Sequence, residues 1–214
     1  MPRTYPNEST EYRDARTRLA TLEQQANALQ ARVAAKRRAL PRGGEVSADY
    51  QFERLAGDGT TESVPLSALF GDAETLIVYS MMFGPERARG CPFCTAYLTQ
   101  LDHAVGQLGD KAAFVVAARS PLQRLVDHAT ANGWNHITMV SDGSSTFHAD
   151  YHGTSLENGQ DEATLNVFVR EGDQVFHHWG AEDEEQPNSE AWFDPFDNVA
   201  NLQGLVPERQ PVTV

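Results

Sequence analysis

The feature that most constrains this chain is an apolar segment, residues 76–83, followed by a charged turn and two cysteines. The segment is too short to cross a bilayer and rich in β-branched and aromatic residues, so it predicts a buried central strand. Gly84 and Pro85 break the strand. Behind the cysteines, apolar residues recur at helical spacing and predict a helix: Leu98, Leu101, Val105 and Leu108.

The two cysteines open this helix in the order Cys91, Pro92, Phe93, Cys94. Proline in the first turn places Cys91 at or near the N-cap, where unpaired N–H groups and the helix dipole favour a thiolate. We expect the Cys91 sulfur to be accessible at the tip of the helix. Cys94 lies one turn later, so we expect it to be more buried and able to resolve a mixed disulfide formed at Cys91. A dithiol that cycles is the prediction; the alternatives are two thiols that merely pack in the core, or half of a metal site. The supporting residues predicted around the pair are Pro92, Phe93, Glu86, Arg87 and Arg89.

Length and cysteine usage bound the class of protein. The 214 residues hold only two cysteines, both in one motif, which argues against a disulfide-stapled secreted scaffold and for a reducing compartment. The start of the chain carries charge and no apolar stretch, so we expect no signal peptide, no membrane span and a cytoplasmic location. We predict a helical arm over 1–44, one domain over 45–206 and a tail over 207–214.

Charge is unevenly distributed. The formal net charge is −13, which disfavours nonspecific binding to nucleic acid or to an anionic membrane. Residues 1–42 nevertheless hold nine Lys or Arg against four Asp or Glu, whereas the remainder holds eight basic and 26 acidic residues. A basic arm and an acidic body are expected to attract each other, within one subunit or across two.

The arm itself predicts one long helix. Residues 9–11 supply a capping region, no Gly or Pro interrupts residues 12–40, and Pro41 ends the pattern. A narrow apolar stripe needs a covering surface, either the protein's own body or the same helix of a second subunit in a homodimer. The stripe follows steps of three and four, interrupted by one lysine: Tyr12, Ala15, Leu19, Leu22, Ala26, Leu29, Val33, Lys36 and Leu40.

Beyond the arm, strand and helix patterns alternate. The order strand, helix, strand, helix favours an α/β fold with parallel strands and right-handed crossovers. Two late strands around Glu171-Gly172-Asp173 predict an antiparallel hairpin. We expect strands at 50–55, 76–83, 112–118, 136–140, 165–170 and 174–179, and helices near 66–70, 94–108, 122–129, 147–151 and 189–202.

Four motifs occur together in this chain: Tyr79-x-Met81-Met82-Phe83-Gly84-Pro85, Gly90-Cys91-Pro92-x-Cys94, Arg119-Ser120-Pro121-Leu122 and Val167-Phe168-x-Arg170. Together they resemble a bacterial family of thioredoxin-like proteins, catalogued as a domain of unknown function and sometimes labelled predicted dithiol-disulfide isomerases. The resemblance implies a three-layer α/β/α sandwich with a central mixed sheet, plus the long N-terminal helix. It also implies a dithiol-disulfide oxidoreductase or isomerase with Cys91 as nucleophile and Cys94 as resolving thiol. No cofactor is expected, because no nucleotide-binding glycine motif occurs, so an external thiol must supply electrons to the thiol or disulfide substrate.

The chain departs from thioredoxins and from peroxiredoxins at identifiable positions. No proline lies where thioredoxins place a cis-proline; Ala163 or Thr164 occupies that position. The strand 76–83 lacks the buried acid of thioredoxins, so Glu86 or a histidine from elsewhere would accept the second thiol's proton. A peroxiredoxin-like thiol peroxidase is an alternative, although Ala88 stands where those enzymes carry a threonine or serine.

A zinc site is the remaining alternative. His148 and His152 are four residues apart and would share one face of a helix, and Cys91 and Cys94 would complete a four-ligand set. The other histidines, among them His128, form no recognisable constellation in the sequence.

Overall fold

The computed structural model describes residues 3–47, 50–181 and 202–207. Most of the helix expected over 189–202 therefore lies outside the described residues. The described part consists mainly of seven strands and three longer helices, which have 29, 15 and 10 residues. The elements are α1 (Thr10–Arg38), β1 (Gln51–Leu55), β2 (Thr61–Pro65), η1 (Leu66–Phe70), β3 (Thr75–Ser80), α2 (Pro92–Gly106), η2 (Gly109–Lys111), β4 (Ala113–Ala118), α3 (Leu122–Ala131), β5 (Thr138–Ser141), α4 (Thr146–Asp150), β6 (Thr164–Glu171) and β7 (Gln174–Gly180).

The strands form a single mixed sheet in the order β2-β1-β5-β4-β3-β6-β7. β3 pairs in parallel with β4 and antiparallel with β6, while β6 and β7 form the predicted antiparallel hairpin. All six residues of β3 are buried, as expected for a central strand flanked on both sides. The predicted α/β class and mixed sheet are confirmed.

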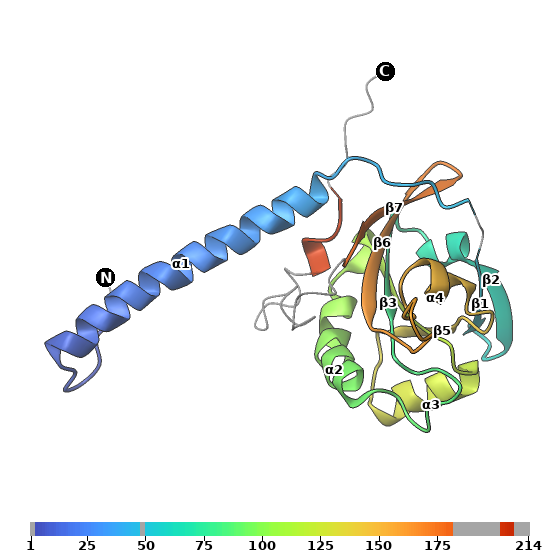
Figure 1. Ribbon diagram of the computed structural model, residues 1–214, viewed down its shortest axis with the longest axis horizontal. Coiled ribbons are helices and arrows are strands. Elements are labelled where there is room, and N and C mark those ends of the chain that lie inside the picture. The colour runs from blue at the N-terminus through green and yellow to red at the C-terminus, as the bar shows by residue number, and fades with distance from the viewer. Residues whose placement is uncertain (1–2, 48–49, 182–201, 208–214) are drawn as a thin grey trace, which may run out of the picture.

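Alternation along β3 separates two cores. Ile77 and Tyr79 face the layer formed by α2 and α3, whereas Leu76 and Val78 face η1 and α4. The sheet thus lies between two helical layers, with α2 and α3 on the side away from α4 (Figure 1). Cys91 and Cys94 both lie in the core between the sheet and α2.

β3 is shorter than predicted, because it ends at Ser80 and not at Phe83. Met81 N still donates to Ala117 O of β4 at 2.8 Å, but Phe83 N donates to Met81 O at 2.7 Å in a tight turn. Ser120 N then donates to Phe83 O at 3.0 Å. The chain therefore leaves the sheet before the glycine and folds back over the end of β4.

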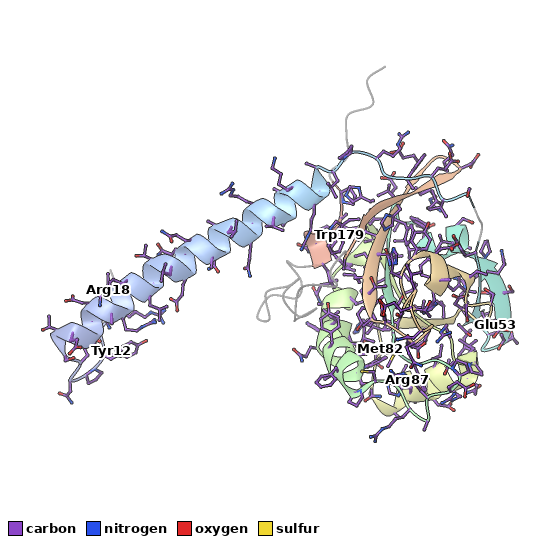
Figure 2. The ribbon with its side chains drawn as sticks, in the orientation of Figure 1. Tyr12, Arg18, Glu53, Met82, Arg87 and Trp179 are labelled. Atoms are coloured by element: carbon purple, nitrogen blue, oxygen red, sulfur yellow. The ribbon has the colours of Figure 1, made fainter. Side chains whose placement is uncertain are left out.

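The long helix α1 forms as predicted and starts at the predicted cap. Ser9 Oγ accepts the N–H of Tyr12 at 3.1 Å. At the other end, the Arg37 guanidinium lies 4.6 Å from the centre of the Trp179 ring, and His178 Nε2 lies 3.0 Å from Arg37 O. Between these ends no residue of α1 is buried, and the helix extends away from the body (Figures 1 and 2).

Candidate active site: a buried dithiol

The first turn of α2 positions both cysteines. Cys91 is the N-cap with extended backbone angles, and Pro92 follows in the first turn, as predicted. Cys91 N donates to Met82 O at 3.1 Å, which ties the start of the helix to the end of the strand segment. Cys91 O accepts from Thr95 N at 2.9 Å and from Thr95 Oγ1 at 2.8 Å. These bonds fix the cysteine backbone at the helix mouth.

Both cysteines are free thiols, and both are buried, with 5% of Cys91 and 2% of Cys94 exposed. The expectation of an accessible Cys91 is therefore wrong, although Cys94 is the more buried of the two, as predicted. The cause is the segment before the helix, which folds back so that Met81 and Phe83 enter the same apolar cluster as both cysteines. Phe93, between them, is 77% exposed and marks where this cluster meets solvent.

Burial raises the pKa of the Cys94 thiol to about 11. Two donors act against this shift by stabilising the thiolate: the Tyr79 hydroxyl and the backbone N–H of Met82. The Cys91 thiol, at the start of the same turn, raises the pKa of Cys94 further. Cys91 thus lies at the helix cap, and Cys94 lies beneath the helix, where the Tyr79 hydroxyl acts on its thiol.

Tyr79 was not identified as a site residue from the sequence. It lies on β3 one position before Ser80 and shares a face with Ile77 and Met81, so strand alternation directs it toward α2. Burial and the neighbouring Cys94 raise the pKa of Tyr79 well above its ordinary value. The phenol is therefore a neutral hydrogen-bond donor at physiological pH. The sequence did offer a signal: Tyr79 carries a polar group within an apolar strand, and it lies two positions before Met81 and therefore on the same face.

Asp161 holds the charged segment between the strand and α2. Its carboxylate accepts Gly84 N at 2.7 Å, Arg87 Nε at 3.2 Å and Arg119 Nη2 at 2.6 Å. Arg119 Nε donates a second bond at 2.8 Å. Only 5% of the Asp161 side chain is exposed, whereas that of Arg87 is 38% exposed. The sequence did not predict this anchor, because the residues come from three separate segments.

Two of the other predicted supporting residues, Glu86 and Arg89, are exposed in the turn before α2. Ala163, at the place where thioredoxins carry a proline, packs against the cluster that contains both cysteines. Thr164 begins β6 and pairs with Ser80. A small side chain therefore packs against this cluster at the position where thioredoxins carry a cis-proline.

His128 of α3 also lies beside the dithiol segment. Its Nε2 is 3.0 Å from Thr95 Oγ1, and a Cβ on Gly90 would come within 3.2 Å of the same nitrogen. The Thr95 hydroxyl already gives its only proton to Cys91 O, so Nε2 must be the donor in this contact. Burial lowers the pKa of His128. The imidazole is linked to the Cys91 backbone through Thr95, a connection that the sequence did not indicate.

The alternative zinc set is not assembled. Both cysteines belong to the core beneath α2, whereas His148 lies on α4, on the opposite side of the sheet. His152 lies beyond the end of α4 and has a φ of 56°, so the expected shared helix face does not exist. Among the described residues, no cluster of three or more His, Cys, Asp or Glu has the geometry of a metal site.

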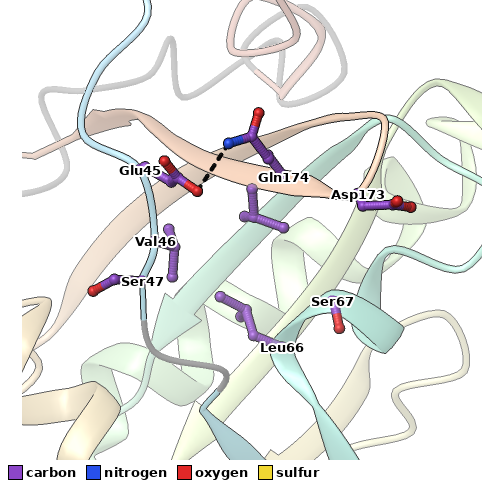
Figure 3. A pocket seen from close by; sticks show the side chains of 8 residues that line it. Glu45, Val46, Ser47, Leu66, Ser67, Asp173 and Gln174 are labelled. Atoms are coloured by element: carbon purple, nitrogen blue, oxygen red, sulfur yellow. Dashed lines mark hydrogen bonds between the residues drawn. The ribbon is translucent and has the colours of Figure 1, made fainter.

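A shallow pocket of about 200 Å³ lies away from the cysteines (Figure 3). It is formed by the segment after α1, by η1 and by the turn between β6 and β7, and Gln174 Nε2 donates to Glu45 Oε1 across it at 3.0 Å. Its floor includes Leu66, which belongs to the core on the α4 side. The pocket is therefore separated by the sheet from the dithiol, and no group with thiol chemistry lines it.

Solved structures with this fold are redox proteins by their titles. Peroxidoxin BcpB from Mycobacterium tuberculosis is 17% identical, covers 78% of this chain and 98% of its own, and gives a TM-score of 0.52. Reduced Prx3 in complex with H2O2 from Vibrio vulnificus is 13% identical, with coverages of 77% and 96% and a TM-score of 0.52. A putative thioredoxin reductase from Burkholderia cenocepacia is 12% identical, with coverages of 70% and 91% and a TM-score of 0.51. At such identities the likeness establishes the fold alone.

The sheet order, the two helical layers and these neighbours define a thioredoxin-like fold. A comparison with curated proteins gave no match. The profile described as "Bacterial protein of unknown function (DUF899)" matches residues 2–204. The chain belongs to that family, as the motifs around the dithiol predicted. Within the described residues, no helix combines the length and apolar character needed to cross a membrane.

Proposed function

We propose that this protein is a thiol-disulfide oxidoreductase in which Cys91 is the nucleophile and Cys94 the resolving thiol. The observation that supports it most is the placement of both thiols in one buried cluster at the first turn of α2, with Cys91 as the N-cap and with the Tyr79 hydroxyl acting on the Cys94 thiol. A dithiol that merely packs in a core has no need of a buried donor aimed at one sulfur.

The proposed reaction has two steps. The Cys91 thiolate attacks a disulfide, forming a mixed disulfide and releasing one substrate thiolate, which takes up a proton. Cys94 then loses its proton and attacks the Cys91 sulfur, which closes the protein disulfide and releases the second substrate thiol. The dithiol gives two electrons to the substrate, and an external thiol returns them in the reverse sequence. The Tyr79 hydroxyl and the Met82 N–H stabilise the Cys94 thiolate during the second step.

The low exposure of Cys91 sets how substrate reaches it. A bulky disulfide must displace the turn before α2, which is tied to Asp161 by the Gly84 N–H and by Arg87. Further hydrogen bonds to the carbonyl groups of this turn come from Ser120 and Arg124. We propose that this turn moves during substrate binding. A small oxidant needs less displacement, so the size of the preferred substrate depends on how readily Asp161 releases the turn.

Turnover of a small aromatic disulfide in the presence of dithiothreitol tests the assignment. Cys91→Ser is expected to lose turnover, and Cys94→Ser to accumulate a mixed disulfide detectable by mass spectrometry. The exposed Thr99→Ser variant on the same helix is the matched control and should keep full activity. If Cys91→Ser retains turnover, the assigned nucleophile is wrong.

A thiol peroxidase is the second candidate, and the peroxiredoxin titles among the structural neighbours favour it. Here Cys91 thiolate attacks hydrogen peroxide, takes one oxygen to become a sulfenic acid and releases water after proton transfer. Cys94 condenses with the sulfenic acid and releases a second water. Peroxide consumption that exceeds disulfide turnover under matched concentrations selects this function.

We further propose that the dithiol works in the cytoplasm and that the arm, 1–44, is a unit separate from the domain, 45–206. Two cysteines confined to one motif are typical of a reducing compartment. The unburied helix α1 supports the separation of the arm from the domain.

A further inference from the structure

Helix α1 presents a large unpartnered surface. It spans 29 residues without burying any, and apolar side chains along one stripe are strongly exposed, with Leu22 at 61% and Leu29 at 56%. Tyr12 and Arg18 lie on the part of the helix that is remote from the body (Figure 2). Isolated helices with such a stripe are marginal in water, so a covering surface would stabilise it.

The stripe has the spacing of a two-stranded coiled coil. In a heptad, the first core position is taken by Tyr12, Leu19, Ala26 and Val33, and the second by Ala15, Leu22 and Leu29. Arg16 and Glu23 lie seven residues apart on one edge of the stripe, where their side chains approach to 3.6 Å. This edge position is where coiled-coil partners exchange charges.

The charges along α1 are polarised. Acidic residues occur only in its first half, and the last of them is Glu23, whereas Arg32, Lys36, Arg37 and Arg38 crowd its end. Two parallel copies would bring these basic ends together and place Lys36 against Lys36 in the core. An antiparallel pair sets each basic end against the acidic start of the other helix and also opposes the two helix dipoles.

We propose that α1 pairs with α1 of a second copy as an antiparallel coiled coil. With the two-fold axis between Leu19 and Leu22, the core layers join Leu19 to Leu22, Ala15 to Ala26 and Tyr12 to Leu29. The same register places Glu11 of one copy beside Arg32 of the other. The two bodies lie at opposite ends of the pair and need not touch.

The oligomeric state tests the pairing, independently of any thiol chemistry. Sedimentation equilibrium of the full chain should give about twice 23.6 kDa. Leu22→Glu places two carboxylates in the central layers and should weaken the dimer about a hundredfold. Gln24→Glu, on the outer face of the same turn, is the matched control and should leave the mass unchanged. A monomeric wild-type chain, or a dimer that survives Leu22→Glu, overturns the proposal.

The direction of pairing is tested by charge. In the antiparallel pair, Arg32→Glu faces Glu11 of the second copy, so the dissociation constant should rise about tenfold at low salt. The double variant Glu11→Arg with Arg32→Glu should restore it. In a parallel pair Arg32 lies beside Arg37 of the second copy, so Arg32→Glu would tighten the dimer. A tighter dimer therefore overturns the antiparallel arrangement.

Discussion

Two buried carboxylates perform related tasks, one at the turn before the dithiol and one at α4. Asp161 accepts the N–H of Gly84 and so holds the turn before the dithiol. Asp142 follows β5, and its Oδ2 accepts both the N–H of His148 at 2.9 Å and His148 Nδ1 at 2.8 Å, holding α4. Asp161 collects donors from segments that are distant in sequence, whereas Asp142 holds a helix that follows it closely in the chain.

The partners of the two carboxylates differ in exposure. Asp142 and His148 are each 1% exposed, whereas the arginines on Asp161 reach solvent. Because an ion pair open to water costs less to separate than a fully buried one, we expect the bonds of Arg87 and Arg119 to Asp161 to open more readily than the bond of His148 to Asp142. The comparison teaches that the exposure of the partners, and not the buried carboxylate alone, determines how firmly a segment is held.

The largest effect on stability is expected at the fully buried pair of Asp142 and His148. Asp142→Asn leaves His148 with a poorer acceptor, and we expect the free energy of unfolding to fall by about 3 kcal/mol. Burial acts to raise the pKa of Asp142, but the His148 bonds prevail and lower it. The carboxylate therefore stabilises the fold above its unfolded pKa, and the stabilisation is lost as pH falls through the lower folded value.

Urea unfolding as a function of pH measures this effect. Asp150→Asn, which alters an exposed carboxylate at the end of α4, is the control and should change the unfolding midpoint little. If wild type and Asp142→Asn differ equally at pH 7 and well below the carboxyl pKa, the charge of Asp142 is not what stabilises α4.

A substitution at Asp161, whose arginine partners are partly exposed, should reduce stability less and should increase the reactivity of Cys91. Asp161→Asn weakens the bonds to Arg87 and Arg119, so we expect about 2 kcal/mol less stability. Because the turn is then released, Cys91 should react several-fold faster with iodoacetamide, read by mass spectrometry of the modified peptide. Unchanged labelling of Cys91 would mean that Asp161 does not control access.

At the dithiol itself, Tyr79→Phe removes a donor from the Cys94 thiolate. We expect the pKa of Cys94 to rise above about 11 and the resolving step to slow about tenfold, because a hydrogen bond to a charged group is lost. The pH dependence of Cys94 alkylation in a Cys91→Ser background gives the pKa directly. Tyr151→Phe, which alters a tyrosine on the other face of the sheet, is the control. Equal shifts of the Cys94 pKa in both variants would mean that Tyr79 does not act on Cys94.

The smallest effect is expected at Ser80. Its hydroxyl and Nε2 of His148 are buried without a hydrogen-bond partner in the described part of the chain, and a Cβ on Gly153 would come close to both side chains. Ser80→Ala removes one such group, so the free energy of unfolding should change by less than about 1 kcal/mol, or rise. A loss of 2 kcal/mol or more in thermal unfolding would reveal a bond to an ordered water.

Local pattern was enough for several features. The apolar run at β3, the proline after Cys91 and the heptad of α1 are written in neighbouring residues, so the central strand, the dithiol helix and the arm were predicted close to their observed bounds. Tyr79 was within reach of the same reasoning, because strand parity directs it toward α2. The end of β3 was placed three residues too late, since apolar character continues through the turn.

Contacts between distant segments were not accessible in this way. Asp161 is more than 70 residues from Gly84 and Arg87, and the linkage of His128 to Thr95 depends on how α3 packs against α2. The burial of Cys91 follows from the fold-back of the segment that carries Met81 and Phe83 and was predicted incorrectly. The alternative zinc set is not assembled for the same reason, because the sheet separates His148 from the cysteines.

The sequence by itself determined the class of fold, the position of both thiols at a helix mouth and the charge polarity of the arm, because each depends on residues within a few turns of one another. Only the tertiary structure decided how deeply the thiols are buried, which donors reach Cys94 and which carboxylate restrains the turn. Those properties arise from burial and hydrogen bonds between segments far apart in the chain, whose meeting is fixed only when the whole sheet has formed.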